Sequence, residues 1–220
     1  MGLKNKNIIT IDGPSASGKG SLAKNLAKTF NFILLDSGLL YRAYSFCFDK
    51  CQNHAVAMEL FSNLRIDNMD YEMHIFENHK DITSLLRHEN VAKSASKLSS
   101  LKETRANLIS LQRDLASNHG LVADGRDMGT VVFPDAATKI FLIADEEVRA
   151  KRRYAELLLY NPSITMKSVI QNIKDRDIAD KERDLSPLIP AHDAFVIDSS
   201  ILNQEEVLDL AIKHYTDRVK

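Results

Sequence analysis

The chain has 220 residues, 44% of them hydrophobic and 27% charged, and its formal net charge is −1. A chain of this length and composition can bury the core of one α/β domain, with room for a small insertion. The near-zero charge argues against binding to nucleic acid or a membrane surface through bulk charge, and the longest apolar run is too short to cross a bilayer.

The N-terminal part of the chain predicts two strand–helix pairs. A short apolar strand at residues 8–11 is followed by a Gly/Ser-rich turn and then by a helix whose apolar residues recur at spacings of three and four. A second buried strand is expected at residues 32–35 and a second helix at residues 39–51. This order is typical of the start of a doubly wound parallel sheet.

The middle of the chain has a different pattern. Between residues 65 and 82 polar and apolar side chains alternate, which is typical of antiparallel strands with one solvent-exposed face. We therefore predict a small β-rich insert over residues 64–97. The core of the protein is then formed by residues 1–63 and 98–220.

Alternating strands and helices return in the C-terminal half. A helix is expected at residues 101–115, and three further buried strands are expected at residues 121–123, 140–143 and 195–197. A charged helical stretch, interrupted near residue 161, lies between the last two strands, and an amphipathic helix ends the chain. We predict a parallel five-stranded sheet flanked by helices, with a helical lid at about residues 149–165.

The turn after the first strand carries the sharpest motif. It consists of Gly13, Pro14, Ser15, Ala16, Ser17, Gly18, Lys19, Gly20 and Ser21. Glycines let successive backbone N–H groups point into one concavity, and the following helix N-terminus adds partial positive charge, so the turn can bind an anion. Lys19 would contact the β- and γ-phosphates of ATP, and the hydroxyl of Ser21 would face Mg²⁺. The sequence therefore predicts an ATP-binding P-loop, with one glycine more than the usual pattern.

Arginines are the second source of chemistry. Phosphoryl transfer between two polyanions requires positive charge at the acceptor phosphate and around the transferred group. Arg126 is the best candidate because it lies in Asp124-Gly125-Arg126-Asp127, directly after a predicted strand. Three more, Arg149, Arg152 and Arg153, follow the next strand on a helix. They form either a solvated helix face or a mobile lid that brings cations to the γ-phosphate and expels water.

Four motifs together resemble those of bacterial cytidylate kinases. They are the P-loop, the Asp36-Ser37-Gly38 and Tyr41-Arg42 pair, the stretch from Asp124 to Pro134, and Arg176-Asp177 with Asp180 and Arg183. The resemblance covers essentially the whole chain and is most specific in the stretch from Asp124 to Pro134. It implies a P-loop kinase of the nucleoside monophosphate kinase family that transfers the γ-phosphate of ATP to CMP or dCMP, with Mg²⁺, and in which the insert binds CMP.

The resemblance also implies roles for individual residues. The CMP phosphate would be surrounded by Ser37, Arg42, Arg126 and Arg183. Cytosine would be bound by Ser96, Arg105 and Asp127, and the ribose by Arg176 and Asp180. The catalytic cations would be Lys19, Arg126, Arg149 and Arg153. The Mg²⁺ ligands would be Ser21 and, as a Walker-B-like carboxylate, Asp124.

The expected role of Asp127 agrees with physical chemistry. A carboxylate accepts a hydrogen bond from the exocyclic amine of cytosine, whereas uracil presents a carbonyl oxygen at that place. A site built for one hydrogen-bonding group strongly rejects an analogue that lacks it. The register of the base-contacting serine stays open, because Ser94, Ser99 or Ser100 could take the place of Ser96.

Two other functions stay in view. A P-loop kinase for another acceptor, such as UMP or a small hydroxylated acid, would depend weakly on CMP. A regulatory protein without chemistry would bind ATP but show no acceptor-dependent turnover. We favour the kinase because Lys19, the arginines and Asp127 are all present.

We expect a cytoplasmic monomer that binds ATP, CMP and dCMP but neither nucleic acid nor membrane. The cysteines, Cys47 and Cys51, suit a reducing compartment.

Overall fold

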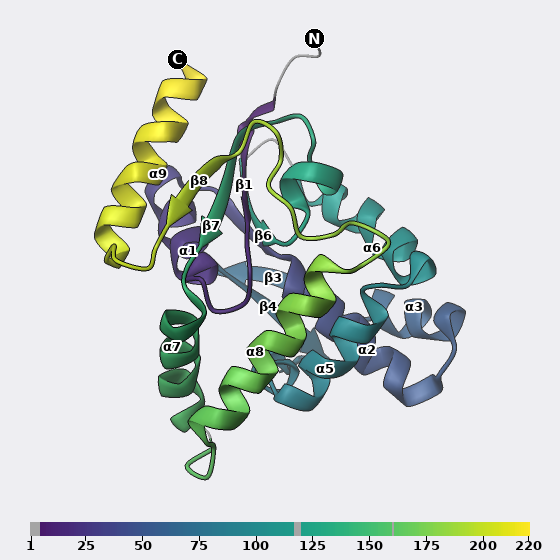
Figure 1. Cartoon of the computed structure of the whole chain (residues 1–220). Coiled ribbons are helices and arrows are strands. Elements are labelled where there is room, and N and C mark those ends of the chain that lie inside the picture. The colour runs from purple at the N-terminus through teal and green to yellow at the C-terminus, as the bar shows by residue number, and fades with distance from the viewer. Residues whose placement is uncertain (1–4, 117–119, 160) are drawn as a thin grey trace.

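The computed structural model describes residues 5–116, 120–159 and 161–220 (Figure 1). The remaining residues, which belong to the predicted core and lid, lie outside the described part of the chain. The centre is a five-stranded sheet with the strand order β2-β6-β1-β7-β8, in which all pairings are parallel. The strands are β1 (Asn5–Asp12), β2 (Ile33–Asp36), β6 (Leu121–Gly125), β7 (Ala136–Ile143) and β8 (Phe195–Asp198). The predicted parallel sheet is therefore confirmed.

Helices cover both faces of the sheet. α1 (Lys19–Phe30) and α9 (Gln204–Val219) pack on one face, while α2 (Ser37–Cys51) and α6 (Lys102–Asp114) lie on the other. The side chains of β1 alternate accordingly, since Ile9 and Ile11 are buried with α1 and Ile8 is buried with α2. Both faces are covered, and the strands therefore read in the sequence as nearly continuous apolar runs.

The insert combines a small sheet with two helices. Strands β3 (Arg65–Met69), β4 (Glu72–Glu77) and β5 (Lys80–Asp81) pair antiparallel, as predicted. They are followed by α4 (Thr83–Leu86) and α5 (Glu89–Leu98), which the sequence pattern did not predict. α5 buries Ala92, Ala95 and Leu98 at a spacing of three, and two of these are alanines, so its apolar periodicity is weak. α3 (His54–Ser62), between α2 and the insert, was also missed.

The hairpin of β3 and β4 is attached to the edge of the core sheet. The backbone N–H of Leu34 in β2 donates to Asn68 Oδ1 at 3.1 Å, and Asn68 Nδ2 donates to the carbonyl of Leu34 at 2.6 Å. The side-chain amide thus pairs with β2 as the backbone of another strand would. An ion pair between Lys24 of α1 and Glu72 of β4 adds a second attachment.

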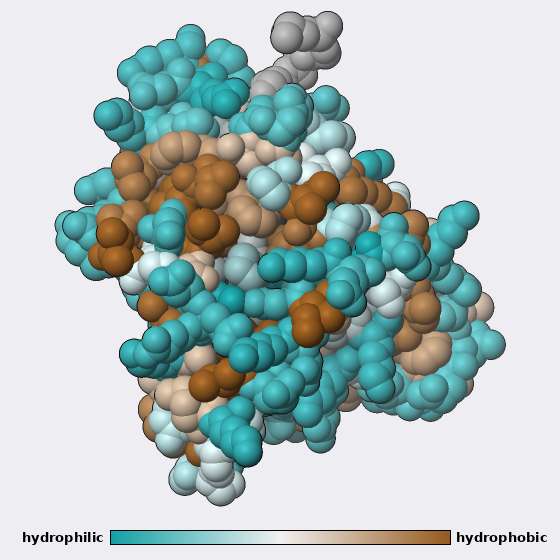
Figure 2. Space-filling view, viewed as in Figure 1, coloured by the Kyte–Doolittle hydropathy of each residue, from teal (hydrophilic) through white to brown (hydrophobic). Residues whose placement is uncertain are grey.

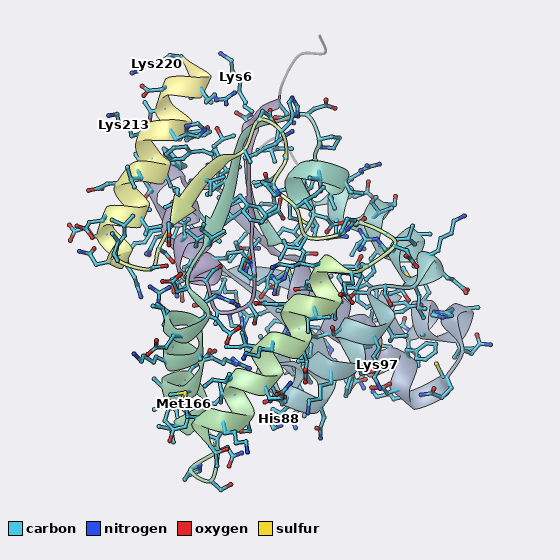
Figure 3. The ribbon with its side chains drawn as sticks, in the orientation of Figure 1. Lys6, His88, Lys97, Met166, Lys213 and Lys220 are labelled. Atoms are coloured by element: carbon cyan, nitrogen blue, oxygen red, sulfur yellow. The ribbon has the colours of Figure 1, made fainter. Side chains whose placement is uncertain are left out.

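α7 (Glu146–Leu158) and α8 (Met166–Lys181) form a helical pair that projects from the sheet, with Met166 at its far end (Figures 1 and 3). The break near residue 161 falls between them, as the sequence predicted. The two helices share a small core of Ala150, Val169 and Ile173, separate from the two main cores. Much of the visible surface of α8 is hydrophilic, whereas apolar residues gather over β8 (Figure 2). No helix among the described residues is long and apolar enough to span a bilayer.

Candidate active site

The P-loop joins β1 to α1 at the carboxyl end of the sheet, where strand ends and helix starts converge. Two of its glycines are required by the backbone. A Cβ on Gly13 would lie 2.1 Å from the carbonyl oxygen of Leu142, and Gly18 has φ 96° at the start of α1. The loop therefore approaches β7 closely and directs the first turn of α1 toward the cavities described below.

Lys19, at the start of α1, and Asp124, at the end of β6, lie in an environment that disfavours the charged form of each side chain. Nζ of Lys19 donates to the carbonyl of Pro14 at 2.7 Å. Burial, and then Arg126, lower the pKa of Lys19 below its usual range, while burial raises the pKa of Asp124. Asp124 Oδ2 lies 3.7 Å from the position of a Cβ on Gly20, so this carboxylate faces the first turn of α1. A bound polyanion would favour the charged form of Lys19.

Two cavities meet at the P-loop. We call the first the inner cavity; it extends from the P-loop between α2, α5, β6 and α8. The residues predicted to bind CMP all line it: Ser37, Arg42, Ser96, Arg105, Arg126, Asp127, Arg176, Asp180 and Arg183. We call the second the outer cavity; it lies on the other side of the P-loop, toward the start of α9. Its lining includes Ser17, Gly18, Lys19, Gly20, Ser21, Arg152, Ser199, Asn203 and Gln204.

A carboxylate fixes two of the inner-cavity arginines. Asp180 accepts from Nε of Arg126 at 2.7 Å and from Nη2 of Arg183 at 2.6 Å. Burial alone would raise the pKa of Asp180, but Arg126 and Arg183 outweigh it and hold that pKa below its usual range. Asp180 is therefore ionised and holds both guanidinium groups in one place.

Two further arginines of the inner cavity, Arg42 and Arg176, have no ion-pair partner among the described residues. Burial, and then the charges of Arg126 and Arg42, lower the pKa of Arg176 to about 10. Burial also lowers the pKa of Arg42. Like charges thus repel one another in the inner cavity, and a bound anion would relieve that repulsion.

Asp127 and Arg105 form a buried ion pair in the lining of the inner cavity. Asp127 directly precedes the π-helical turn η1 (Met128–Val132). The backbone of this turn is fixed by Asp12 at the end of β1, which accepts from the N–H groups of Met128 and Gly129, each at 2.8 Å. Asp12 was not among the predicted site residues, although a buried carboxylate that ends an apolar strand is a recognisable signal.

Three arginines of α7 point in different directions, although their spacing places them near one another on the helix. Arg149 does not line either cavity: it lies behind the P-loop, where it donates to the carbonyl of Ser15 at 3.2 Å and to Asp177 of α8 at 2.6 Å. Arg152 donates to the hydroxyl and the carbonyl of Ser199 and lines the outer cavity. Arg153 lines the inner cavity and is held by Glu156 at 2.8 Å.

The four serines near the end of α5 are distinguished by their positions. Ser96 and Ser99 line the inner cavity, whereas Ser94 and Ser100 do not. The hydroxyl of Ser94 donates to Asp49 at 2.9 Å, and that of Ser99 donates to the carbonyl of Ser96. Of these four serines, Ser96 is therefore the one that lines the inner cavity without donating a hydrogen bond from its hydroxyl to another described residue.

Sequence reasoning missed three charged residues where the two cavities meet. Asp36, Arg87 and Glu156 line both cavities. Asp36 ends β2 and accepts from the N–H of Leu39 at 2.9 Å, which caps α2. Its position at a strand end in Asp36-Ser37-Gly38 was a usable signal, but no local pattern marks Arg87 or Glu156.

The fold and the site together define a P-loop kinase, because a P-loop joins two cavities, one of them lined by arginines. The family model for cytidylate kinase matches residues 9–217. The chain belongs to the cytidylate kinase family. It is a nucleoside monophosphate kinase that transfers a phosphoryl group from ATP to CMP or dCMP.

Curated relatives resemble the chain over nearly its full length. A cytidylate kinase of Mannheimia succiniciproducens is 42% identical over 222 residues, which cover 98% of this chain and 99% of the relative. A cytidylate kinase of Protochlamydia amoebophila is 42% identical, with 97% of each chain covered. A crystal structure of an uncharacterized protein from Eubacterium ventriosum has a similar fold, with a TM-score of 0.52 at 15% identity over 96% of this chain and 99% of that protein.

Proposed function

We propose that the inner cavity binds CMP or dCMP, that the outer cavity binds ATP, and that the phosphoryl group is transferred where the two cavities meet at the P-loop. One observation carries this assignment. Nine residues expected at the CMP site from the sequence come from α2, α5, α6 and α8, and from the segments that follow β6 and α8, yet they line a single cavity beside Lys19.

The reaction needs positioning and charge stabilisation more than acid–base chemistry. An anionic oxygen of the CMP phosphate attacks the γ-phosphorus of ATP, the bond from that phosphorus to the β–γ bridging oxygen breaks, and its electron pair leaves with ADP. The attacking oxygen is already an anion, so it needs no general base. We assign Ser37, Arg42, Arg126 and Arg183 to the CMP phosphate. Lys19 and the P-loop N–H groups hold the β- and γ-phosphates.

The described residues fit Mg²⁺ that arrives with ATP. They contain no cluster of three or more His, Cys, Asp or Glu that could hold a metal ion. Mg²⁺ does not need one, because it keeps several waters and binds through one or two carboxylates together with substrate phosphates. We propose that Ser21 and Asp124, at the start of α1 and the end of β6, supply the protein oxygens. When bound, Mg²⁺ neutralises charge that develops on the phosphates.

The ion pair of Asp127 and Arg105 is the proposed place of cytosine selection. We propose that Asp127 accepts from the exocyclic amine of the base, with Arg105 holding the carboxylate in place and Ser96 contacting the ring. Uracil would present an acceptor to Asp127 and leave it unsatisfied. Arg176 and Asp180 face the ribose in this arrangement. Since Asp180 is held by two arginines, we expect the ribose to share this network.

The lid arginines have separate tasks in this proposal. We expect the predicted lid at residues 149–165 to close over ATP together with α7 and α8. On closure, Arg153 would leave Glu156 and bind the γ-phosphate. Arg149 acts on the γ-phosphate through the P-loop, because it is fixed to the carbonyl of Ser15 and to Asp177. We also propose that residues 64–97 form the CMP-binding insert and move toward the core when CMP binds.

We propose that the protein works as a monomer in the cytoplasm. One chain supplies all the residues assigned to both cavities. The thiols of Cys47 and Cys51 are free, and Cys51 donates to backbone carbonyls, as suits a reducing compartment.

The decisive experiment measures ADP release with ATP and Mg²⁺ in the presence of CMP, dCMP, UMP, AMP or GMP, with a control that lacks any acceptor. We expect turnover to favour CMP and dCMP strongly over the other three. Equal turnover of UMP would contradict the role of Asp127. ATP binding without acceptor-dependent ADP release would contradict the assignment of the two cavities.

A further inference from the structure

Arg87 follows α4 in the insert and lies across the cavities from the P-loop. Among the described residues, it is the one arginine that lines both cavities. The segment that contains Arg87 is also attached to α8. Asn172 Nδ2 in α8 donates to the carboxylate of Glu89, at the start of α5, at 3.0 Å. Figure 3 labels His88, the residue between Arg87 and Glu89, beside α8. The insert therefore places this cation where the outer and inner cavities meet.

Arg87 is held much more weakly than Arg126 and Arg183, the two arginines that Asp180 fixes. Its Nη2 lies 3.8 Å from Asp36 Oδ2, and its side chain is 52% exposed. Arg126 and Arg183 contact Asp180 at 2.7 and 2.6 Å, and Arg183 is only 7% exposed. Arg87 is thus a cation at the cavity junction without a close counter-charge among the described residues.

The electrostatic influence of Arg87 reaches both sides of the junction. Burial lowers the pKa of Arg42, and the charge of Arg87 adds to that effect. Burial raises the pKa of Asp124, and Lys19 and Arg87 oppose that rise. Arg42 lines the inner cavity, and Asp124, at the end of β6, lines both cavities, as Arg87 does. Arg87 therefore acts on a residue assigned to the acceptor phosphate and on one assigned to Mg²⁺ and ATP.

We propose that Arg87 is a further catalytic residue, which contacts the transferred phosphoryl group when both nucleotides are bound. The inference rests on the function proposed above. Negative charge in the transition state is spread over the three equatorial oxygens of this group, and a guanidinium can contact two of them at once. An arginine aimed at charge that develops in the transition state lowers the barrier without tightening the binding of either substrate.

This role links the insert to the chemistry. In the proposed arrangement Arg42 of α2, Arg126 after β6 and Arg183 after α8 approach the CMP phosphate from the core. Arg87 approaches from the insert. Binding of CMP under the insert would then bring the last cation into place. The same arrangement would reduce hydrolysis of ATP when CMP is absent, since the cation would not be positioned over the γ-phosphate.

The test compares Arg87→Ala, Arg87→Lys and Arg65→Ala with the wild type in steady-state ADP release. Arg65 is a matched control, because it is an insert arginine that is 59% exposed, pairs with Asp67 and lines neither cavity. We expect Arg87→Ala to lower kcat by about 100- to 1,000-fold, as for removal of one transition-state contact. The Kd of CMP and of ATP should change less than about threefold, since the contact forms mainly in the transition state.

Two readouts separate catalysis from a structural effect. Arg87→Lys should recover part of the lost kcat, because it restores the charge but not the two-point contact. Added guanidinium ion should raise the kcat of Arg87→Ala but not that of Arg65→Ala. Circular dichroism and the melting temperature of each variant show that the comparison is made on folded protein; if Arg87→Ala is unfolded, Arg87→Met, which keeps most of the stem, takes its place.

The proposal is overturned if Arg87→Ala keeps kcat within about twofold of the wild type, as Arg65→Ala should. It is equally overturned if the loss lies entirely in the Kd of CMP, which would make Arg87 a binding residue. Failure of the wild type to release ADP with CMP would instead contradict the proposed function, so the two failures can be distinguished.

Discussion

The P-loop and the inner cavity, which we propose to bind the phosphates of ATP and of CMP, are built in different ways. The P-loop is a run of consecutive residues that offers backbone N–H groups, one lysine and one hydroxyl. The inner cavity is assembled from side chains on elements far apart in the sequence. Backbone groups recognise any phosphate chain, whereas side chains can be chosen for one acceptor. Changes in the P-loop should therefore alter the rate with every acceptor, and changes in the inner cavity should alter which acceptor is used.

The largest effect is expected for Lys19→Ala. Loss of the charge at the β- and γ-phosphates should lower kcat/KM by at least about a thousandfold with CMP and dCMP alike. Steady-state ADP release measures this, with Lys28→Ala near the exposed end of α1 as a control. A loss confined to one acceptor would break the distinction between the two regions.

Asp127→Asn should mainly change specificity. Its amide can donate to the carbonyl oxygen of uracil, so the ratio of kcat/KM for CMP to that for UMP should fall by about a hundredfold or more. Asp135→Asn, an exposed change a few residues along the same segment, is the control. The melting temperature must be measured too, because the change removes a partner of Arg105. An unchanged ratio in a stable variant would contradict the role of Asp127.

Ser96→Ala and Ser99→Ala form a matched pair that sharpens the register of α5. Only the Ser96 hydroxyl is available as a donor to a base, since that of Ser99 donates to the carbonyl of Ser96. We expect KM for CMP to rise about fivefold in Ser96→Ala, the loss of one neutral hydrogen bond, and less than about twofold in Ser99→Ala. The reverse order would assign the contact to Ser99.

The smallest effect on activity is expected for Asn68→Ala, which removes both hydrogen bonds to Leu34. The free energy of unfolding should fall by about 1 kcal/mol, because these bonds lie near the surface. Urea unfolding measures this, with the exposed Asn63→Ala as control, and kcat with CMP should stay within about threefold. A loss of kcat as large as that of Lys19→Ala would mean that the insert controls the P-loop.

The difference between the P-loop and the inner cavity also explains which parts of the site the sequence predicts. The P-loop and Asp124-Gly125-Arg126-Asp127 are consecutive residues at the ends of apolar strands, so local pattern alone locates them. The parallel sheet was predictable for the same reason. The spacing of Arg149, Arg152 and Arg153 indicates a shared helix region, but it cannot show that Arg149 is held by Asp177, which lies on another helix.

The missed features depend on contacts between distant elements. Arg87 becomes notable only when the insert is folded over the P-loop, and nothing in its immediate sequence marks it. Asp12 supports the turn after Asp127 across 116 positions of the chain. α5 was missed because its buried face is built largely from alanine, which contributes little to an apolar pattern.

The contact of Asn68 with β2 also affects how the molecule meets its own copies. A sheet can add a strand from a neighbouring molecule wherever an edge leaves backbone groups unpaired. At β2 the amide of Asn68 already occupies the N–H and the carbonyl of Leu34. The opposite edge is β8, a strand of four residues with Val196 exposed and Asp198 at its end. The insert thus blocks the addition of a strand from another molecule at the β2 edge. A chain without the insert would expose unpaired backbone groups at both edges of the sheet, β2 and β8.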